Sequence, residues 1–283
     1  MQDVIEKLAG RDNRAEGDYT ENGILMCGKC RTPKQALKEL PTAGGGTRSI
    51  LVPVACRCDA EDLAAQKETA KRLEFSRWVS EQQAMYGISE GLCRGQSFAQ
   101  DDRRTPAISD ICHRYVERWE EMRADNMGVL FYGSVGTGKS FYACAIVNAL
   151  LEKCVPATVT NFPRLLNLLQ GAGNRQTYID HLQRWQLLVI DDLGVERDSS
   201  YAAEQVFNVI DARARSGLPL IVTTNLTLDE MKNPISMQYA RIYDRVLEMC
   251  PVTIMMNGES RRKGNAEARR AKARELLRKE DKP

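Results

Sequence analysis

The segment that constrains the fold most is GSVGTGKS, from Gly133 to Ser140, which follows an apolar run and precedes a long helical pattern. It matches the phosphate-loop pattern G-x-x-x-x-G-K-[S/T]. Glycines allow such a loop to wrap closely around phosphates, and the helix that follows adds positive potential. The segment therefore predicts a strand, a loop and a helix that bind ATP. The expected binding residues are Gly133, Ser134, Val135, Gly136, Thr137, Gly138, Lys139, Ser140 and Phe141.

Two side chains of this loop have expected roles in the chemistry. Lys139 should reach the β- and γ-phosphates, and the hydroxyl of Ser140 should bind Mg²⁺. The alternative is a fortuitous glycine-rich turn, which arises in roughly one chain in a hundred of this length at average residue usage. Here the pattern also lies between an expected strand and an expected helix, as nucleotide binding requires.

Apolar strands and helices alternate after this loop. Further strands are expected at PATVTN, LLVIDD, LPLIVTTN and CPVTIMM, with a helical segment before each of the last three. Short, continuously apolar strands joined by helices are typical of a parallel sheet that is covered on both faces. The expected fold class is therefore α/β. A long charged helix is expected ahead of this core, from Ala60 to about Tyr86.

Polar residues at the ends of two strands should complete the nucleotide site. Asp191 ends a buried strand, so its carboxylate is expected to bind Mg²⁺, and Asp192 to orient or deprotonate the attacking water. Asn225 ends the LPLIVTTN strand, where it would hydrogen-bond the γ-phosphate or the water. The alternatives are structural, with Asp192 as the cap of a turn and Asn225 as a turn former.

The order and spacing of these motifs resemble the AAA+ ATPases, which have a Walker A loop, a Walker B strand and a polar sensor-1 residue. IDDLGVE, VTTN, ARIYDRVLE and GESRR further resemble the DnaC/DnaI helicase loaders and the related IstB-like transposition ATPases, over about residues 87–263. The resemblance implies an AAA+ phosphate-loop core with ATPase activity. The second Walker B acid of this group is often Glu, whereas Asp192 stands here, and its shorter reach implies slow, switch-like hydrolysis.

The same resemblance implies roles for two arginines. Arg245 occupies the position of the arginine finger, which in this family reaches the nucleotide of a neighbouring subunit, so self-association through nucleotide-bridged interfaces is implied. Arg241 is a second candidate, and salt bridges on a solvated face are the alternative for both. The last family motif, S-Y-R, reads Ser260-Arg261-Arg262 here. Without a gap Arg262 takes the sensor-2 position, and the choice between Arg262 and Arg261 stays open.

The chain ends soon after the last expected strand. About 27 residues follow it, too few for the helical lid of most AAA+ proteins, and loader-type members similarly lack a full lid. From Gly258 the tail carries 10 basic and 5 acidic residues, so it either touches nucleic acid or is merely solvated. The expected boundaries are 1–59 for an N-terminal module, 60–95 for a helical linker, 96–263 for the ATPase core and 264–283 for a basic tail.

Four of the nine cysteines cluster near the N-terminus, with Cys27 and Cys30 in CGKC and Cys56 and Cys58 in CRC. Two cysteines at i and i+3 in a tight turn can bind one metal ion, and a pair at i and i+2 on a strand projects to one side and can complete a tetrahedron. These four are therefore expected to bind zinc, which would allow a segment with few large apolar side chains to fold. Free thiols and a redox pair are the alternatives.

The expected zinc module has a further resemblance. CGKCRTPKQ with a later CRC is similar to the N-terminal zinc module of phage and Gram-positive loader proteins, which implies contact with the replicative helicase. A DNA-binding zinc ribbon is the alternative, because the module contains Arg31, Lys34, Lys38, Arg48 and Arg57.

The other cysteines stand singly, several of them in apolar or helical contexts, and are expected to be buried free thiols, since free cysteine behaves as a small hydrophobic residue. They are Cys93, Cys112, Cys144, Cys154 and Cys250.

An ATPase joined to a cysteine-rich adaptor favours a switch that acts on another protein. The leading hypothesis is a helicase loader that also binds single-stranded DNA in a basic groove. The residues expected in that groove are Arg164, Arg175 and Arg184, with Phe162 and Tyr178 as stacking surfaces; the alternative is a helix pair with packed aromatic side chains. The second hypothesis is a transposition regulator that binds duplex DNA and activates a transposase. A non-enzymatic adaptor is the third, and the intact Lys139, Asp191 and Arg245 count against it.

Charge and hydropathy give only coarse limits. The net charge is +2, from 40 basic and 38 acidic residues, so any nucleic-acid binding must come from local patches. No stretch approaches the 18 or more apolar residues of a membrane span, and the N-terminus lacks the order of a secretory signal. The expected location is therefore cytoplasmic.

Overall fold

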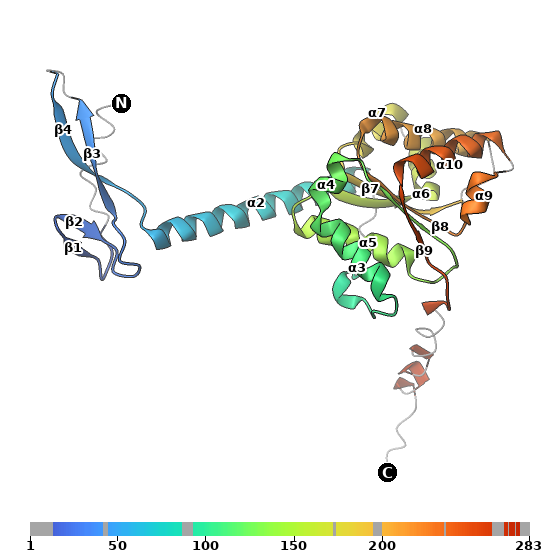
Figure 1. Ribbon diagram of the computed structural model, residues 1–283, viewed down its shortest axis with the longest axis horizontal. Helices are drawn as coiled ribbons and strands as arrows, with labels where there is room; N and C mark the ends of the chain where they lie inside the picture. The colour runs from blue at the N-terminus through green and yellow to red at the C-terminus, as the bar shows by residue number, and fades with distance from the viewer. Residues whose placement is uncertain are drawn as a thin grey trace, which may run out of the picture. The chain divides into compact units, whose positions relative to one another are not determined.

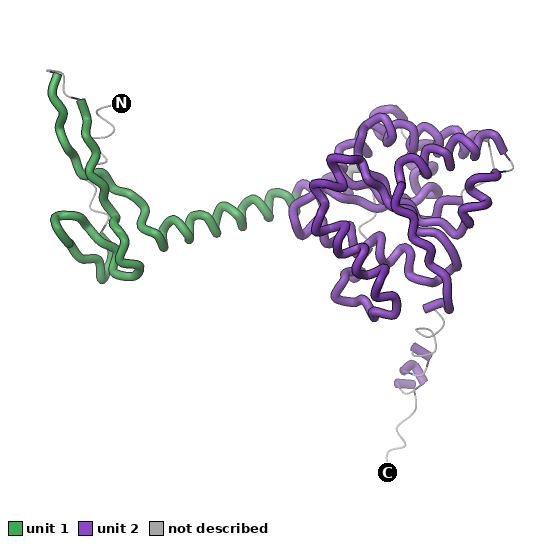
Figure 2. Tube along the Cα trace, in the orientation of Figure 1, with its two compact units in different colours: residues 1–77 green, residues 78–283 purple. Residues whose placement is uncertain are grey.

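The computed structural model describes residues 14–41, 45–86, 93–171, 174–194, 200–234 and 236–261, together with 269–270, 272–274 and 276–277. The chain divides into two compact units, residues 1–77 and 78–283, which Figure 2 colours separately. None of the helices in these described ranges is both long and apolar enough to cross a membrane.

The first unit contains two antiparallel hairpins and the start of a long helix. Strands β1 (Tyr19–Glu21) and β2 (Ile24–Met26) form the first hairpin, and β3 (Gln35–Pro41) and β4 (Thr47–Pro53) form the second. Helix α2 (Arg57–Tyr86) begins directly after these strands, and its residues from Trp78 onward belong to the second unit. The long helix expected from Ala60 is confirmed, and it begins three residues earlier.

The second unit is built on a five-stranded sheet in the order β6-β7-β8-β5-β9, in which every pairing is parallel (Figure 1). This confirms the expected parallel α/β core. The strands are β5 (Val129–Tyr132), β6 (Ala157–Asn161), β7 (Leu187–Leu193), β8 (Leu220–Thr224) and β9 (Val252–Met255).

Helices cover both faces of this sheet, with α3 and α5 on one side and α8 and α10 on the other (Figure 1). Successive residues of a central strand, such as Val129, Leu130 and Phe131 of β5, are therefore all buried. This explains why the strands read as continuous apolar runs. The helical elements are η1 (Phe98–Gln100), α3 (Pro106–Glu117), α4 (Trp119–Ala124), α5 (Lys139–Glu152), α6 (Phe162–Gly171), α7 (Arg175–Leu182), α8 (Ser200–Ser216), α9 (Leu228–Lys232) and α10 (Met237–Met249).

Two of the five cysteines expected as free thiols are instead joined. Cys93 and Cys144 form a disulfide across 51 positions of the sequence, so the expectation was wrong for this pair. The physical reason is the packing of the segment before η1 against α5, where Asn148 donates hydrogen bonds to the carbonyl oxygens of Cys93 (3.0 Å) and Gln96 (2.6 Å). Cys112 and Cys250 are buried free thiols as expected, and the free thiol of Cys154 is half-buried.

Arg213 of α8 is fully buried beneath the start of two strands. Its guanidinium donates hydrogen bonds to the carbonyl oxygens of Trp185 (2.8 Å), Gln186 (2.9 Å) and Pro219 (2.7 and 3.2 Å), which precede β7 and β8. Burial lowers the pKa of Arg213 to about 9, so the side chain remains cationic at neutral pH. One side chain thus supplies donors to three backbone carbonyl groups, of which that of Pro219 also accepts a hydrogen bond of 3.5 Å from the backbone N–H of Leu188.

Arg213→Met should therefore lower the free energy of unfolding by about 3–5 kcal/mol, because three carbonyl oxygens would lose the hydrogen bonds that the buried guanidinium donates. Urea denaturation followed by circular dichroism measures this change. Arg215→Met is the matched control, since Arg215 lies two residues later on the same helix and its side chain is 74% exposed. Equal midpoints for the two variants would contradict the structural role of Arg213.

Candidate functional site

The phosphate loop connects β5 to α5, as the sequence predicts. Gly133, Gly136 and Gly138 have backbone φ angles of +120°, +81° and +106°, which residues other than glycine rarely adopt. Space is also limiting, because a Cβ atom at Gly136 would lie 2.1 Å from the Oγ atom of Ser260. The glycines of the motif are thus required both by the backbone turn and by the chain segment that packs on it.

Lys139 lies at the first position of α5 and is 5% exposed. Its Nζ atom donates hydrogen bonds of 2.8 Å to the carbonyl oxygens of Gly133 and Ser134 and to Oδ1 of Asn225. The structure therefore brings the phosphate-loop lysine and the polar residue after β8 together, although 86 positions separate them.

The two acids after Ile190 occupy a β-bulge. The register between β7 and β8 shifts between Ile190 and Leu193, and Asp192 adopts a φ angle of +58°. The carboxylate of Asp191 accepts a hydrogen bond of 2.6 Å from the hydroxyl of Thr223 on β8. Sequence reasoning missed this bulge, which gives adjacent acids different surroundings.

These elements enclose a cavity of about 480 Å³ at the carboxyl ends of the strands. Eight expected residues line it, namely Val135, Gly136, Gly138, Lys139, Ser140, Phe141, Asp192 and Asn225. Arg261, one of the two arginines left open by the sequence, lines it as well, and four others were not expected at this place: Gln96, Gln100, Asp102 and Arg104. These four come from the segment before α3, whose charged and polar residues carry no spacing signal that would have marked them.

Arg261 packs over the phosphate loop. Its backbone N–H donates to the carbonyl oxygen of Gly136 (2.9 Å), and its guanidinium donates to Asp102 (3.0 Å) and to the hydroxyl of Thr105 (3.1 Å). The guanidinium also lies over the ring of Tyr142, 5.7 Å from its centroid. Of the two arginines that the sequence left open, Arg261 lines the cavity, whereas Arg262 lies outside the described residues.

Arg245 lies on α10 and does not line this cavity. Its side chain is 43% exposed and forms ion pairs with Glu248 (2.8 Å) and Asp211 (3.7 Å). Arg241, one turn earlier, lines a separate cavity of about 300 Å³ with Phe207 and Met237. Within a single chain, then, Arg245 makes the surface ion pairs that the sequence allowed as its alternative role.

Comparison with known proteins identifies the family. A profile of the IstB-like ATP binding protein family matches residues 116–269, which is more than half of the chain. The chain belongs to the IstB-like ATP-binding family. The match extends from α3 through the phosphate loop and both acids to the described residues of the tail.

Relatives of this IstB-like chain include two replicative helicase loaders. DnaI of Bacillus subtilis (strain 168) is 27% identical over an alignment of 188 residues, and the match covers 59% of this chain and 58% of DnaI. DnaC of Escherichia coli (strain K12) is 26% identical over 148 residues, which are 50% of this chain and 59% of DnaC. The chain thus spans less than two thirds of the length of these relatives.

A crystal structure of DnaI is similar to this IstB-like chain in fold. The TM-score is 0.52 at 22% sequence identity, and the superposition covers 62% of this chain and 94% of the other. The expected AAA+ phosphate-loop fold is confirmed. In the described part of the chain no helical lid domain follows β9, which also agrees with the expectation.

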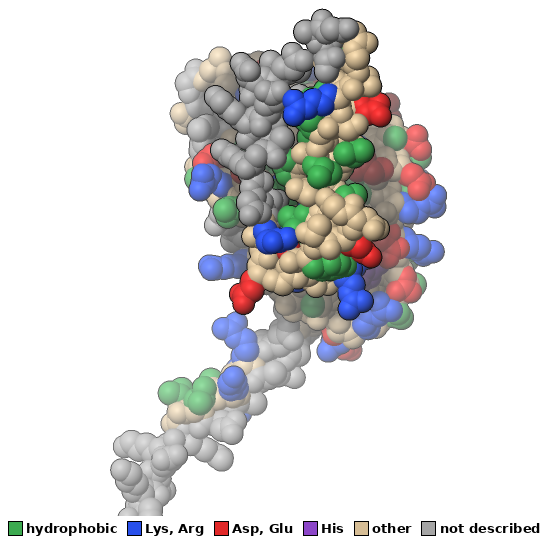
Figure 3. Space-filling view, turned by 90° about the vertical axis from the view of Figure 1, so that its left-hand side faces the viewer, with side chains coloured by type: hydrophobic (Ala, Val, Ile, Leu, Met, Phe, Trp, Pro, Cys, Tyr) green, Lys and Arg blue, Asp and Glu red, His purple; other side chains and the backbone are tan. Residues whose placement is uncertain are grey.

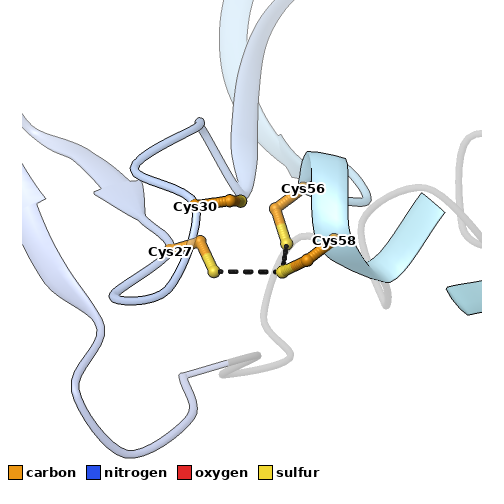
Figure 4. Close-up of side chains that lie close together, drawn as sticks. All are labelled: Cys27, Cys30, Cys56 and Cys58. Atoms are coloured by element: carbon orange, nitrogen blue, oxygen red, sulfur yellow. Dashed lines mark hydrogen bonds between the residues drawn. The ribbon is translucent and has the colours of Figure 1, made fainter. Parts of the chain in front are cut away.

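The four clustered cysteines of this family member lie together in the first unit (Figure 4). Their Sγ atoms all lie within 4.8 Å of one another; those of Cys27 and Cys58 are 3.6 Å apart and those of Cys56 and Cys58 are 3.2 Å apart. Zinc–sulfur bonds of about 2.3 Å in a tetrahedron place the sulfurs about 3.8 Å apart. The cluster therefore fits a structural zinc ion.

The expectation that the second cysteine pair lies on a strand was wrong. Cys56 immediately precedes α2, and Cys58 lies in its first turn (Figure 4). The strand β4 ends at Pro53, after which the chain turns into the helix. The start of a helix thus brings the thiols of Cys56 and Cys58 to one site, as a strand was expected to do.

Hydrogen bonds to sulfur favour the thiolate form of Cys27 and Cys30, whereas the pKa values of Cys56 and Cys58 are raised. The hydroxyl of Thr32 and the backbone N–H of Cys58 lower the pKa of Cys30 to about 5. The backbone N–H groups of Cys30 and Lys29 lower the pKa of Cys27. Thiolates are the form in which cysteine binds zinc.

A buried ion pair supports the loop that carries the first two cysteines. Lys34 and Asp18 lie 2.8 Å apart with side chains only 6% and 3% exposed, and Asp18 also accepts a hydrogen bond of 3.0 Å from the backbone N–H of Gly28. The ammonium group of Lys34 is thus paired with Asp18 inside the module. Hydrophobic side chains remain on the surface of this unit (Figure 3), among them Leu37, which is 63% exposed.

The structure shows how far the side chains of the expected single-stranded DNA surface are exposed. Phe162 and Tyr178 are buried, 1% and 6% exposed, so the expectation that they are stacking surfaces was wrong. Both lie on the apolar faces of short helices that pack into the core. Arg175 and Arg184 are exposed, and Arg175 lies over the ring of Tyr201. The two aromatic side chains therefore pack as the alternative predicts, and the contact of the arginines with DNA stays a prediction.

Proposed function

We propose that this chain is an ATP-dependent loader that binds a replicative DNA helicase and delivers it onto single-stranded DNA. ATP binding and slow hydrolysis act as its switch. One observation carries the proposal: a complete phosphate-loop cavity occupies one compact unit, and a four-cysteine cluster occupies another. The relatives named as replicative helicase loaders support it.

In this proposal the residues expected at the nucleotide site have the following tasks. Lys139 binds the β- and γ-phosphates, Asn225 contacts the γ-phosphate or the water, and Asp192 activates the water. Ser140 and Asp191 hold Mg²⁺, whose preference for oxygen ligands fits a hydroxyl and a carboxylate. The metal neutralises phosphate charge when bound.

Arginines complete the proposed site. Arg261 lies beside the phosphate loop and stabilises charge on the phosphates, a role assigned by sequence to either Arg261 or Arg262. Arg245 acts from a neighbouring subunit, and its exposed position on α10 leaves it accessible to a second copy. Chains therefore associate at least transiently during hydrolysis.

The zinc-bound first unit is the proposed contact for the helicase. Exposed apolar side chains such as Leu37 offer a surface for a protein partner, and the burial of Lys34 in an ion pair reduces the basic surface available to DNA. A regulator of transposition is the second candidate, because the matched family is named for IstB. The separate cysteine unit favours the loader.

Deletion of residues 1–59 should abolish capture of a purified replicative helicase while ATP affinity stays within about twofold of that of the full chain, because the cavity lies wholly in the second unit. A pulldown at about 1 mM ATP measures helicase capture. A nucleotide titration measures the affinity for ATP.

Helicase capture that survives the deletion would exclude the adaptor role of the first unit. A full chain that ignores the helicase but stimulates a transposase on duplex DNA would favour the second candidate.

A further inference from the structure

Thr223 links the two acids of the nucleotide site. It lies on β8, the middle strand of the sheet, and is fully buried. Its hydroxyl donates a hydrogen bond of 2.6 Å to Oδ1 of Asp191 and accepts one of 2.9 Å from the backbone N–H of Asp192. The same hydroxyl group therefore donates a hydrogen bond to Asp191 and accepts one from Asp192.

The second of these bonds stabilises the β-bulge. The bulge places two residues, Asp191 and Asp192, opposite Thr223, and Asp192 has the left-handed φ angle of +58° that is unfavourable for a residue with a side chain. The Thr223 hydroxyl accepts the hydrogen bond of the Asp192 N–H in this conformation. The bulge in turn directs Asp192 to the cavity lining.

We propose that Thr223 is a positioning residue for metal binding and hydrolysis. Its hydroxyl fixes the carboxylate of Asp191, which would hold Mg²⁺, and at the same time holds the backbone of Asp192 in the conformation that brings this residue to the cavity lining. The inference rests on the proposed ATPase function and adds a residue that couples the two acids. Partners that orient a metal ligand typically contribute 10- to 100-fold to metal affinity or activity.

Three variants of the full chain test this role. Thr223→Val removes the hydroxyl at nearly constant volume, Thr223→Ser keeps it, and Thr160→Val is the matched control. Thr160 is likewise a fully buried threonine of the sheet, and its hydroxyl has no hydrogen-bond partner among the described residues. Thermal melting of each variant reports whether the fold is intact.

Metal binding is measured separately from turnover, by electron paramagnetic resonance of Mn²⁺ with a non-hydrolysable ATP analogue. Thr223→Val should raise the Kd for Mn²⁺ by about 10- to 100-fold and lower kcat by a similar factor. Binding of the analogue in EDTA should stay within about twofold of wild type, since the phosphate loop is unchanged. Thr223→Ser should restore both values to within about threefold, and Thr160→Val should match wild type.

The outcomes separate this inference from the proposed function. Active wild-type protein with Thr223→Val indistinguishable from Thr160→Val in Mn²⁺ affinity and kcat would overturn the role of Thr223 alone. Thr223→Ser as impaired as Thr223→Val would also overturn it, because the hydroxyl would not be the group that matters. Wild-type protein that neither binds Mn²⁺ with the analogue nor hydrolyses ATP would overturn both.

Discussion

Lys139→Ala is expected to raise the Kd for ATP by at least about 100-fold. The ammonium group donates to three oxygen atoms of the loop and of Asn225, so it is already held where the phosphates are expected to bind. Two hydrogen bonds to charged phosphate oxygens, at about 1.5–3 kcal/mol each, account for a loss of this size. Isothermal titration calorimetry with ATP and Mg²⁺ measures it.

Two further variants make that result specific. Asp192→Asn should leave the Kd within about threefold and suppress turnover by about 100-fold or more, because it keeps the shape of the side chain and removes the base. Lys232→Ala, on exposed α9, is the charge-matched control. Equal turnover in Lys139→Ala, Asp192→Asn and wild type would refute the assignment of the site.

Replacing Cys30 and Cys56 together with serine should remove zinc and unfold the first unit. Among its described residues 14–41 and 45–58 the buried side chains are only Leu25, Cys27, Lys34 and Cys56, too few to form an apolar core. Structural zinc supplies about 10–16 kcal/mol of apparent binding free energy in small domains of this kind. Metal analysis should find one zinc per wild-type chain and none in the variant, and limited proteolysis should cleave the variant within residues 14–58.

The control for that experiment is Cys154→Ser, since Cys154 is a half-buried free thiol of the second unit. It should retain one zinc per chain and the wild-type proteolysis pattern. Reduced wild-type protein without stoichiometric zinc would eliminate the metal site, and the first unit would then need another source of stability.

Features that depend on a few consecutive residues could be predicted from the sequence, whereas features that join distant segments could not. The phosphate loop and Lys139 follow from eight consecutive residues, and the strand that carries Asp191 follows from a continuous apolar run. By contrast, the ion pair between Asp102 and Arg261 joins positions 159 apart, and nothing in either segment announces it. The same is true of the Cys93–Cys144 disulfide, which depends on how two segments pack.

Two other features of the structure differ from what the sequence predicted. The tandem Asp191-Asp192 reads as the simple end of a strand, yet the bulge and Thr223 give the two acids separate environments. Phe162 and Tyr178 lie in helices whose apolar faces turn inward, and sequence spacing alone does not distinguish a stacking surface from a core contact. The buried alternative holds because short helices gain most of their stability from packing.

The contact between Gly136 and Ser260 has a mechanical consequence. The backbone N–H of Arg261 donates to the Gly136 carbonyl, and no atom as large as a methyl group fits between the loop and Ser260. An outward displacement of the loop would therefore collide with Ser260, in the segment that follows β9. The position of the loop and the position of this segment are thus mechanically coupled.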